Sequence, residues 1–201
     1  MIKRNLLVMG LAVLLSACGF HLRGTGTSEL AFKELDLSAR NAYGETVMMM
    51  RQTLQSSGVN VTAAAPYKLV LTNEQTSQRS LSYSGAGRTA ENELTTVLDY
   101  QIVGQNNLSL ISDKLQVQKV VMHDGSNITG SVQEQDEARK EIHRELVQRM
   151  MLRLQQITPA QLDQLQQTAN ARAKAEADAL DAAQKAEANT PRQSPLQIPA
   201  E

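Results

Sequence analysis

The segment from Glu93 to Val103 alternates apolar and polar residues with a period of two, and this pattern restricts the possible folds more than any other. Apolar side chains at every second position place one face of a strand against a core, while the polar side chains between them face water. The apolar face comprises Leu94, Leu98, Tyr100 and Ile102, and the polar face comprises Glu93, Thr95, Asp99 and Gln101. A strand buried on one face only is typical of an antiparallel sheet.

Two neighbouring segments, 67–83 and 108–122, also have the pattern of extended chain. Their apolar positions are Leu69 and Leu71 in the first segment, and Leu115 and Val117 in the second. Turn-forming residues at 84–87 and 104–107 separate the three segments. The sequence therefore predicts an antiparallel meander of three strands.

Two other segments have the periodicity of amphipathic helices. Residues 45–57 place Val47, Met50 and Leu54 on one face, and we interpret the run Met48-Met49-Met50 as core filling. The second helix is predicted to begin at the capping box SVQE at 131–134 and to end before Pro159. Its apolar stripe comprises Ala138, Ile142, Leu146, Met150 and Leu154, widened by Val147, Met151 and Ile157.

With a further strand at 32–37, the predicted order is β-α-β-β-β-α over a domain of residues 30–159. The predicted fold class is α+β, with two amphipathic helices packed on one face of a four-stranded mixed sheet. Residues 160–201 form an Ala/Gln-rich tail that we predict to be partly helical to disordered. Within its helical part only Leu165 and Leu180 could be buried, so removing the tail should cost almost no apolar contact.

The N-terminus begins with Lys3 and Arg4, followed by a short apolar stretch at 6–15. That stretch is too short to span a bilayer as a helix, and it ends in the tetrapeptide LSAC at 15–18. This tetrapeptide is typical of a lipobox, in which small residues precede a cysteine that accepts a diacylglyceryl group. Cys18 is the only cysteine of the chain. The alternative is an ordinary signal peptide with an incidental cysteine.

We therefore predict a signal peptide at 1–17 and a lipidated tether at 18–29. Cys18 would carry S-diacylglycerol and an N-palmitoyl group, which together anchor the protein stably to a membrane. The residue after it is Gly19 rather than an aspartate, which favours the outer membrane.

The composition argues against several classes of function. The chain has 20 basic and 21 acidic residues, so it lacks the positive charge that nucleic-acid binding requires. Its three histidines are scattered without metal-ligand spacing, and we predict no metal and no cofactor apart from the covalent lipid. Among them, His143 lies in mid-helix with Glu141 nearby. No nucleophile elbow or paired carboxylates occur, so we expect no enzymatic activity.

The heptapeptide CGFHLRG at 18–24 resembles the start of the LPS-assembly lipoprotein family, LptE (RlpB), whose members open with a lipidated cysteine, glycine, an aromatic residue and His-Leu-Arg. Further similarity lies at 89–91, at 111–114 and at 134–136. The resemblance covers residues 18 to 160 and leaves out the tail. It implies two helices packed on a four-stranded sheet, in agreement with the order predicted above.

The resemblance also implies a function. Members of the family act as the plug and assembly partner of the LptD outer-membrane β-barrel, and they contact lipopolysaccharide on its way to the cell surface. The protein would then lie on the periplasmic side of the outer membrane and within the barrel lumen. The alternative is a structural outer-membrane lipoprotein with a different protein partner.

A lipopolysaccharide site needs cations for its phosphates. The candidates are Arg79, Arg88, Lys114 and Lys119, which the predicted strands place near loop ends or on the last strand. Where members of the family carry a basic residue in the first hairpin loop, this chain has Gly85, and Arg88 follows three positions later. Each of these side chains could equally be an ordinary solvated surface charge.

Overall fold

The computed structural model describes residues 30–83, 89–124 and 127–189. Its elements, in chain order, are β1 (Glu34–Ala39), α2 (Glu45–Ser56), β2 (Asn60–Val61), β3 (Lys68–Tyr83), β4 (Thr89–Val103), the 3-10 turn η1 (Gln105–Asn107), β5 (Ser109–Asp124), α3 (Ile128–Gln156) and α4 (Pro159–Asn189). The predicted lipobox with Cys18, the tether, the loop at 84–87 and Arg88 lie outside the described residues.

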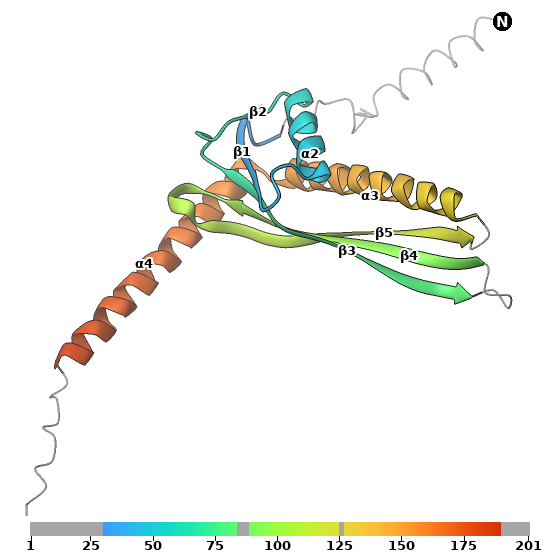
Figure 1. The fold of residues 1–201 in the computed structure, drawn as a ribbon. Helices are drawn as coiled ribbons and strands as arrows, with labels where there is room; N and C mark the ends of the chain where they lie inside the picture. Colours follow the sequence, from blue (N-terminus) through green and yellow to red (C-terminus); the bar gives the residue numbers. More distant parts are fainter. Residues whose placement is uncertain (1–29, 84–88, 125–126, 190–201) are drawn as a thin grey trace, which may run out of the picture.

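The strands form one mixed sheet with the order β2-β1-β3-β4-β5. β3, β4 and β5 pair antiparallel along nearly their whole lengths, which confirms the predicted meander. β1 pairs parallel with β3 only from Lys68 to Leu71, so most of β3 extends beyond β1. The mixed sheet, with α2 and α3 on one of its faces, confirms the predicted α+β class (Figure 1).

The sheet has five strands instead of the predicted four. The additional strand, β2, contains only Asn60 and Val61 and pairs parallel with β1. Backbone hydrogen bonds hold it there, from the Asn60 N–H to the Lys33 carbonyl (2.9 Å) and from the Thr62 N–H to the Leu35 carbonyl (3.2 Å). Two residues are too few to produce a period-two pattern, so sequence periodicity could not detect this strand.

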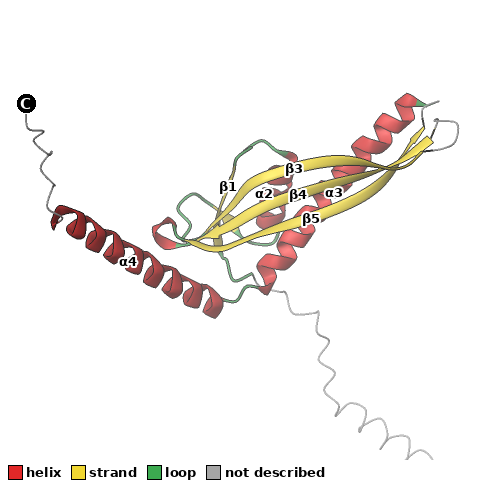
Figure 2. Ribbon diagram, turned by 90° about the horizontal axis from the view of Figure 1, so that it is seen from below, coloured by secondary structure: helices red, strands yellow, loops and turns green. Residues whose placement is uncertain are grey.

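The core lies between the sheet and the two helices. Seen from below, the strands lie in front of α2 and α3, and no described element covers this face of the sheet (Figure 2). Every residue of the predicted apolar face of β4 is buried, as are both leucines of β1 and the spacing-four stripe of α3. In the methionine run, Met50 is fully buried while Met48 is 55% exposed, so the core-filling interpretation holds for Met50 and fails for Met48.

The start of α3 differs from the prediction. The helix begins at Ile128, and its N-cap is Asn127, whose side-chain oxygen accepts a hydrogen bond from the Gly130 N–H. Ser131 lies inside the helix, where its hydroxyl bonds with the backbone of Asp124. Glu134 accepts a hydrogen bond from the Met122 N–H on the outer edge of β5. The serine and glutamate of the expected capping box therefore attach the helix to the edge strand.

The predicted tail begins as part of the folded domain. Leu162 is 2% exposed and belongs to the main hydrophobic cluster. One turn later, the side-chain oxygen of Gln166 accepts a hydrogen bond from the Gln105 N–H (2.9 Å). A Cβ atom at Gly104 would collide with that oxygen, so the close approach of α4 requires glycine there. The expectation that removing residues 160–201 would cost almost no apolar contact is therefore wrong, because Leu162 belongs to the core.

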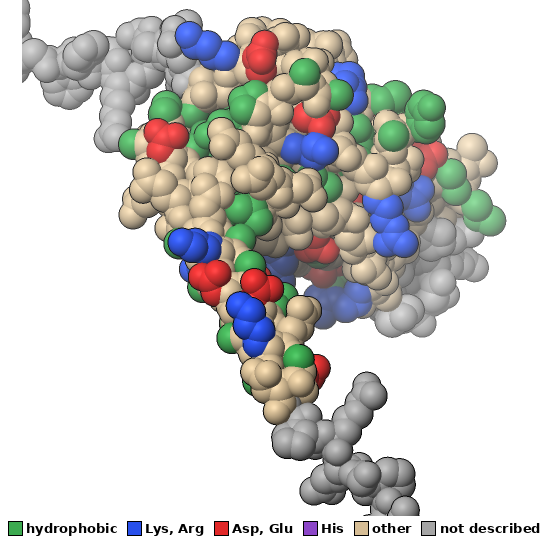
Figure 3. All heavy atoms as spheres, turned by 90° about the vertical axis from the view of Figure 1, so that its left-hand side faces the viewer, with side chains coloured by type: hydrophobic (Ala, Val, Ile, Leu, Met, Phe, Trp, Pro, Cys, Tyr) green, Lys and Arg blue, Asp and Glu red, His purple; other side chains and the backbone are tan. Residues whose placement is uncertain are grey.

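Beyond this contact, α4 projects away from the sheet (Figure 1). Side chains of both charges alternate along the projecting part (Figure 3). Leu180, which could have been buried, is 64% exposed. No helix of the described residues is both long and apolar enough to cross a bilayer.

Candidate functional site

The structure separates the cations predicted to bind lipopolysaccharide. Arg79 lies opposite Glu93, on the face of the sheet that the helices leave uncovered, and forms an ion pair with it (3.2 Å). Lys114 lies opposite Asp99 on the same face. Because Glu93 and Asp99 are six positions apart along β4, Arg79 and Lys114 are separated by about 20 Å along the strands. They cannot contact one phosphate group together.

Lys119 lies on the other face of the sheet. Its cross-strand neighbour is Leu94, which is buried beneath the helices. The Lys119 ammonium lies 3.0 Å from Glu141 and 3.8 Å from Glu145, both on α3. Its charge is therefore paired between β5 and α3, and it lies on the face of the sheet opposite to Lys114.

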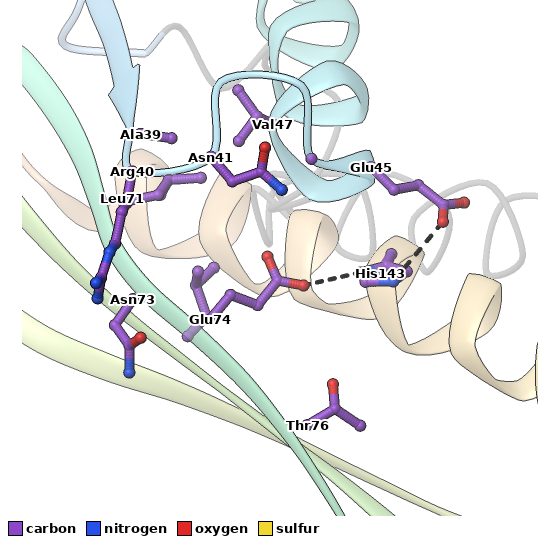
Figure 4. A pocket seen from close by; sticks show the side chains of 12 residues that line it. Ala39, Arg40, Asn41, Glu45, Val47, Leu71, Asn73, Glu74, Thr76 and His143 are labelled. Carbon is purple, nitrogen blue, oxygen red and sulfur yellow. Dashed lines mark ion pairs between the residues drawn. The ribbon is translucent and has the colours of Figure 1, made fainter.

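The described residues form a cavity of about 440 Å³ between the β1–α2 loop, β3 and the middle of α3. Figure 4 shows the side chains that reach into it. Its lining comprises Ala39, Arg40, Asn41, Gly44, Glu45, Val47, Leu71, Asn73, Glu74, Thr76, Leu98 and His143. Polar groups dominate, and they come from segments far apart in the chain.

Two residues of the cavity lining, Glu74 and His143, belong to a hydrogen-bonded network with the buried Thr46. The Thr46 hydroxyl donates to Glu74 Oε1 (3.0 Å) and lies 2.8 Å from His143 Nδ1. His143 Nδ1 lies 3.1 Å from the same carboxylate oxygen, and Nε2 lies 3.7 Å from Glu45 Oε2. The network joins α2, β3 and α3 at the point where the three elements meet (Figure 4).

The network changes the acidity of two of its members. The hydrogen bond to Glu74 raises the pKa of His143 above its usual 6.5. Burial acts to lower this pKa, while the charges of Glu74 and Glu45 act with the hydrogen bond to raise it. Burial alone would raise the pKa of Glu74. The hydrogen bonds from His143 and Thr46 overcome that effect, so the pKa of this carboxyl lies below its usual 4.5. Both shifts favour the ion pair.

Other polar residues also line the cavity, although the Asn73 side chain lies with Asp99 on the face of the sheet that the helices leave uncovered. Arg40 makes no side-chain hydrogen bond or ion pair with any residue the structure describes. Asn41 accepts a hydrogen bond from the Tyr43 N–H (3.3 Å), while its amide nitrogen has no partner among the described residues. Asn73 donates weakly to Asp99 (3.4 Å), and its carbonyl oxygen is free of any described partner.

Sequence reasoning missed this cavity. It identified His143 as a solitary histidine near Glu141, whereas the structure pairs it with a glutamate on β3 and a threonine on α2. Thr46 and His143 are separated by 97 positions, and no local pattern relates them. Within the described ranges, no group of three acidic, histidine or cysteine side chains could hold a metal ion.

Comparison with known proteins identifies the family. A model of the family LptE, described as Lipopolysaccharide-assembly, matches residues 32–154, which is more than half of the chain. The chain belongs to the LptE family. The match extends from the start of β1 almost to the end of α3, and it excludes α4. The resemblance seen in the sequence is thereby confirmed.

Curated relatives include two LPS-assembly lipoproteins LptE. The chain is 33% identical over 102 residues to the protein of Photorhabdus laumondii, covering 48% of this chain and 56% of the relative. It is 35% identical over 103 residues to the protein of Pectobacterium atrosepticum, covering 48% and 55%. The chain thus matches about half the length of these curated relatives.

Two solved structures share the fold. The rare lipoprotein B of Shewanella oneidensis has a TM-score of 0.55 and 20% identity, over 60% of this chain and 92% of that one. Lipoprotein B of Nitrosomonas europaea has a TM-score of 0.57 and 21% identity, over 70% and 90%. At these identities the similarity establishes the arrangement of helices and strands.

Proposed function

We propose that the protein is an outer-membrane lipoprotein of the lipopolysaccharide export translocon, anchored by lipid on Cys18, and that it acts as plug and assembly partner of the LptD β-barrel. The observation that carries this proposal is the family match over residues 32–154, because those residues contain the whole sheet, α2 and nearly all of α3. Its role is binding and assembly rather than catalysis.

The shape of the domain suits the lumen of a barrel. β3 contains 16 residues and is therefore about 53 Å long, which exceeds the roughly 30 Å of a bilayer's hydrocarbon core. The face of the sheet that the helices leave uncovered carries polar side chains at most positions, among them Gln75, Ser77, Thr95, Gln116 and Gln118. A large barrel has a polar interior, so such a face can lie against it and keep its polar groups solvated or hydrogen-bonded.

Lipopolysaccharide contact is the finer part of the proposal. Of the predicted cations, Lys114 fits best, because it is exposed and makes no ion pair with any described residue. Arg79 is exposed and shares its charge with Glu93, and Lys119 is held by two glutamates. Arg88 stays a candidate on sequence grounds alone.

The experiment is a pull-down of the full-length protein from membranes in mild detergent, with mass spectrometry of both the bait and its partners. We expect a diacylglyceryl and an acyl group on Cys18, and an outer-membrane barrel as the main co-purifying protein. Cys18→Ala should lose the lipid and keep the circular dichroism spectrum of the wild type. Recovery of a soluble or inner-membrane partner instead of a barrel would favour the alternative of a structural lipoprotein with a different partner.

A further inference from the structure

The outer edge of β5, which no other strand pairs with, is protected by α3 along its second half. Arg149 of α3 donates a hydrogen bond to the Gln116 carbonyl on this edge (2.6 Å). Further along the strand, the backbone groups of Met122 and Asp124 bond with side chains from the first turns of α3. The three strand residues that α3 reaches in this way all have even numbers.

Ser112 and Lys114 belong to the same outward-facing set, because successive residues of a strand direct their backbone groups alternately to its two sides. β5 pairs with β4 in one continuous register from Ile111 to Asp124. Neither backbone group of Ser112, nor the Lys114 carbonyl, has a hydrogen-bond partner among the described residues. The Lys114 N–H is held by Asp113 Oδ1 (2.8 Å). An unpaired edge of this kind can pair with another strand.

A cleft lies beside this open part of the edge. α4 passes the beginning of β5 before it leaves the domain (Figure 1). The described residues form a cavity of about 520 Å³ there, whose apolar lining comprises Ile111, Ile157 and Leu165. A second cavity of about 340 Å³ continues it along α4, since Leu165 and Thr168 line both. The family match ends at residue 154, so the cleft depends on a helix that the match does not include.

The residues of the cleft face the outer edge of β5. Arg153 lies one turn after Arg149 on α3 and pairs with Asp113 (2.8 Å), so both arginines lie on the side of α3 that faces this edge. Asp113 is opposite the buried Tyr100, which places its side chain on the helix-covered face of the sheet. A strand added at the edge would therefore direct every second side chain into the cleft.

The charges that line the cleft cancel. Asp113 and Arg153 neutralise each other, and Arg172 and Glu176 of α4 supply one charge of each sign. A charged ligand would therefore lose its hydration without meeting an excess of opposite charge. A peptide backbone is neutral and repeats N–H and carbonyl groups at the spacing of the unpaired groups of β5. The lining and the edge together favour an extended, uncharged peptide.

We propose that the edge of β5 at 112–114 binds an extended, uncharged peptide segment of a partner protein. The segment adds to the five-stranded sheet as a further strand and inserts a branched apolar side chain between Ile111, Ile157 and Leu165. The inference goes beyond the proposed function, because neither a lipid anchor nor a polar plug surface requires an added strand. The other occupants to be separated by the test are a second copy of the chain and the chain's own residues 190–201.

The test is fluorescence anisotropy of a labelled heptapeptide of alternating threonine and isoleucine, titrated with the full-length protein in detergent. We expect saturable binding, and the Ser112 amide should exchange its hydrogen more slowly in the complex. The same peptide N-methylated at every residue cannot donate main-chain hydrogen bonds and should bind about tenfold more weakly. A peptide with serine in place of isoleucine should also bind more weakly, because it loses the apolar contact in the cleft.

Ser112→Pro and Ser112→Ala are matched variants at the edge. Proline removes the outward N–H, which an edge strand tolerates, whereas alanine keeps it. Ser112→Pro should weaken binding of the unmodified peptide about tenfold, and Ser112→Ala should bind it as the wild type does. Because Ser112 is exposed, both variants should keep the wild-type melting temperature. Thr168→Trp fills the cleft from an exposed position of α4 and should also weaken binding.

The proposal is overturned if the unmodified peptide does not bind, or if the N-methylated peptide binds as tightly. It is also overturned if Ser112→Pro binds the unmodified peptide as the wild type does. A dimer of the protein alone that Ser112→Pro dissociates would assign the edge to a second copy and remove the need for a partner. Binding only to a chain that ends at residue 189 would assign the cleft to residues 190–201, and this too would overturn the proposal.

Discussion

The two long helices α3 and α4 have nearly equal lengths, 29 and 31 residues, and very different surroundings. α3 buries eight residues against the sheet and α2. α4 buries only Leu162 and Gln166, both within its first two turns, and the rest projects from the domain. Beyond Ala160, α4 contains ten further alanines and many charged residues. Its helical state therefore relies on the intrinsic helix propensity of these residues.

The difference shows that helix formation and membership of the core are separate properties. Tertiary packing stabilises α3, which has buried leucine, isoleucine and methionine at spacing four. Intrinsic helix propensity stabilises most of α4, because this helix has few tertiary contacts. Substitutions should therefore affect the whole domain when they lie in α3 and only the local helix when they lie in the projecting part of α4.

The largest effect is expected from a charge in the stripe of α3. Leu146 is fully buried, so Leu146→Asp places an unpaired carboxylate in the core and should cost roughly 3–5 kcal/mol of unfolding free energy. Leu180→Asp is the matched change in α4, where the leucine is 64% exposed. Thermal unfolding should show a large drop for the first variant and no drop for the second. Equal melting temperatures would contradict the assignment of α3 to the core.

A smaller effect is expected at the base of α4. A chain that ends at residue 157 loses Leu162, and this should cost roughly 2–3 kcal/mol. A chain that ends at residue 173 keeps Leu162 and the bond of Gln166 to Gln105, so its unfolding free energy should match that of the full chain. Chemical denaturation of the two truncated proteins measures the difference. If both were as stable as the full chain, Leu162 would not belong to the core.

The pH dependence of stability should depend on the network beneath α3. The pKa of His143 is raised above 6.5, so its contribution is complete below that pH and falls as the pH rises through the folded-state pKa. The pKa of Glu74 is lowered below 4.5, so its contribution is present above that pH and falls as the pH drops through the folded-state pKa. The network should therefore stabilise most between pH 4.5 and 6.5.

His143→Gln tests this window. We expect the variant to be roughly 1–2 kcal/mol less stable than the wild type within the window, with the gap closing as the pH rises above it. Lys185→Gln, on the exposed part of α4, is the control and should give a constant difference near zero at every pH. A wild-type–variant gap that does not change with pH would show that His143 acts by packing alone.

The smallest global effect is expected from Ala177→Gly in the projecting part of α4. Glycine in place of an exposed helical alanine should cost about 1 kcal/mol of local helix stability. Because that segment does not contact the core, the midpoint of domain unfolding should not move. Hydrogen exchange resolved by residue should be faster around position 177 and unchanged in α3. A fall in the domain's melting temperature would mean that α4 packs more extensively.

Much of the domain could be predicted because its elements follow simple periods. The β4 alternation, the α3 stripe and the leucines of β1 all face the core as their spacing indicates. The prediction failed where structure depends on one or two residues. β2 is too short to have a period, and the serine and glutamate of the expected capping box bond with β5 instead of starting a helix.

The candidate sites were harder to predict. The sequence could show that Arg79, Lys114 and Lys119 belong to strands, yet the face of the sheet that each occupies decides its partners. The assembled sheet places Lys119 between two glutamates and leaves Lys114 exposed on the opposite face. The cavity at His143 combines residues from β1, α2, β3, β4, α3 and the β1–α2 loop, and no local sequence pattern connects these segments.

The sequence alone predicted the family, through a resemblance led by its N-terminal heptapeptide, and the two-layer fold, through the periods of its strands and helices. Those features are local, since a short window contains all the residues that specify them. Only the tertiary structure decided that α4 begins within the core, that the predicted cations are divided between two faces, and that His143 meets Glu74 and Thr46. Each of these depends on contacts between separate elements, from Arg79 with Glu93 at 14 positions to Thr46 with His143 at 97, so no single periodic segment contains both partners.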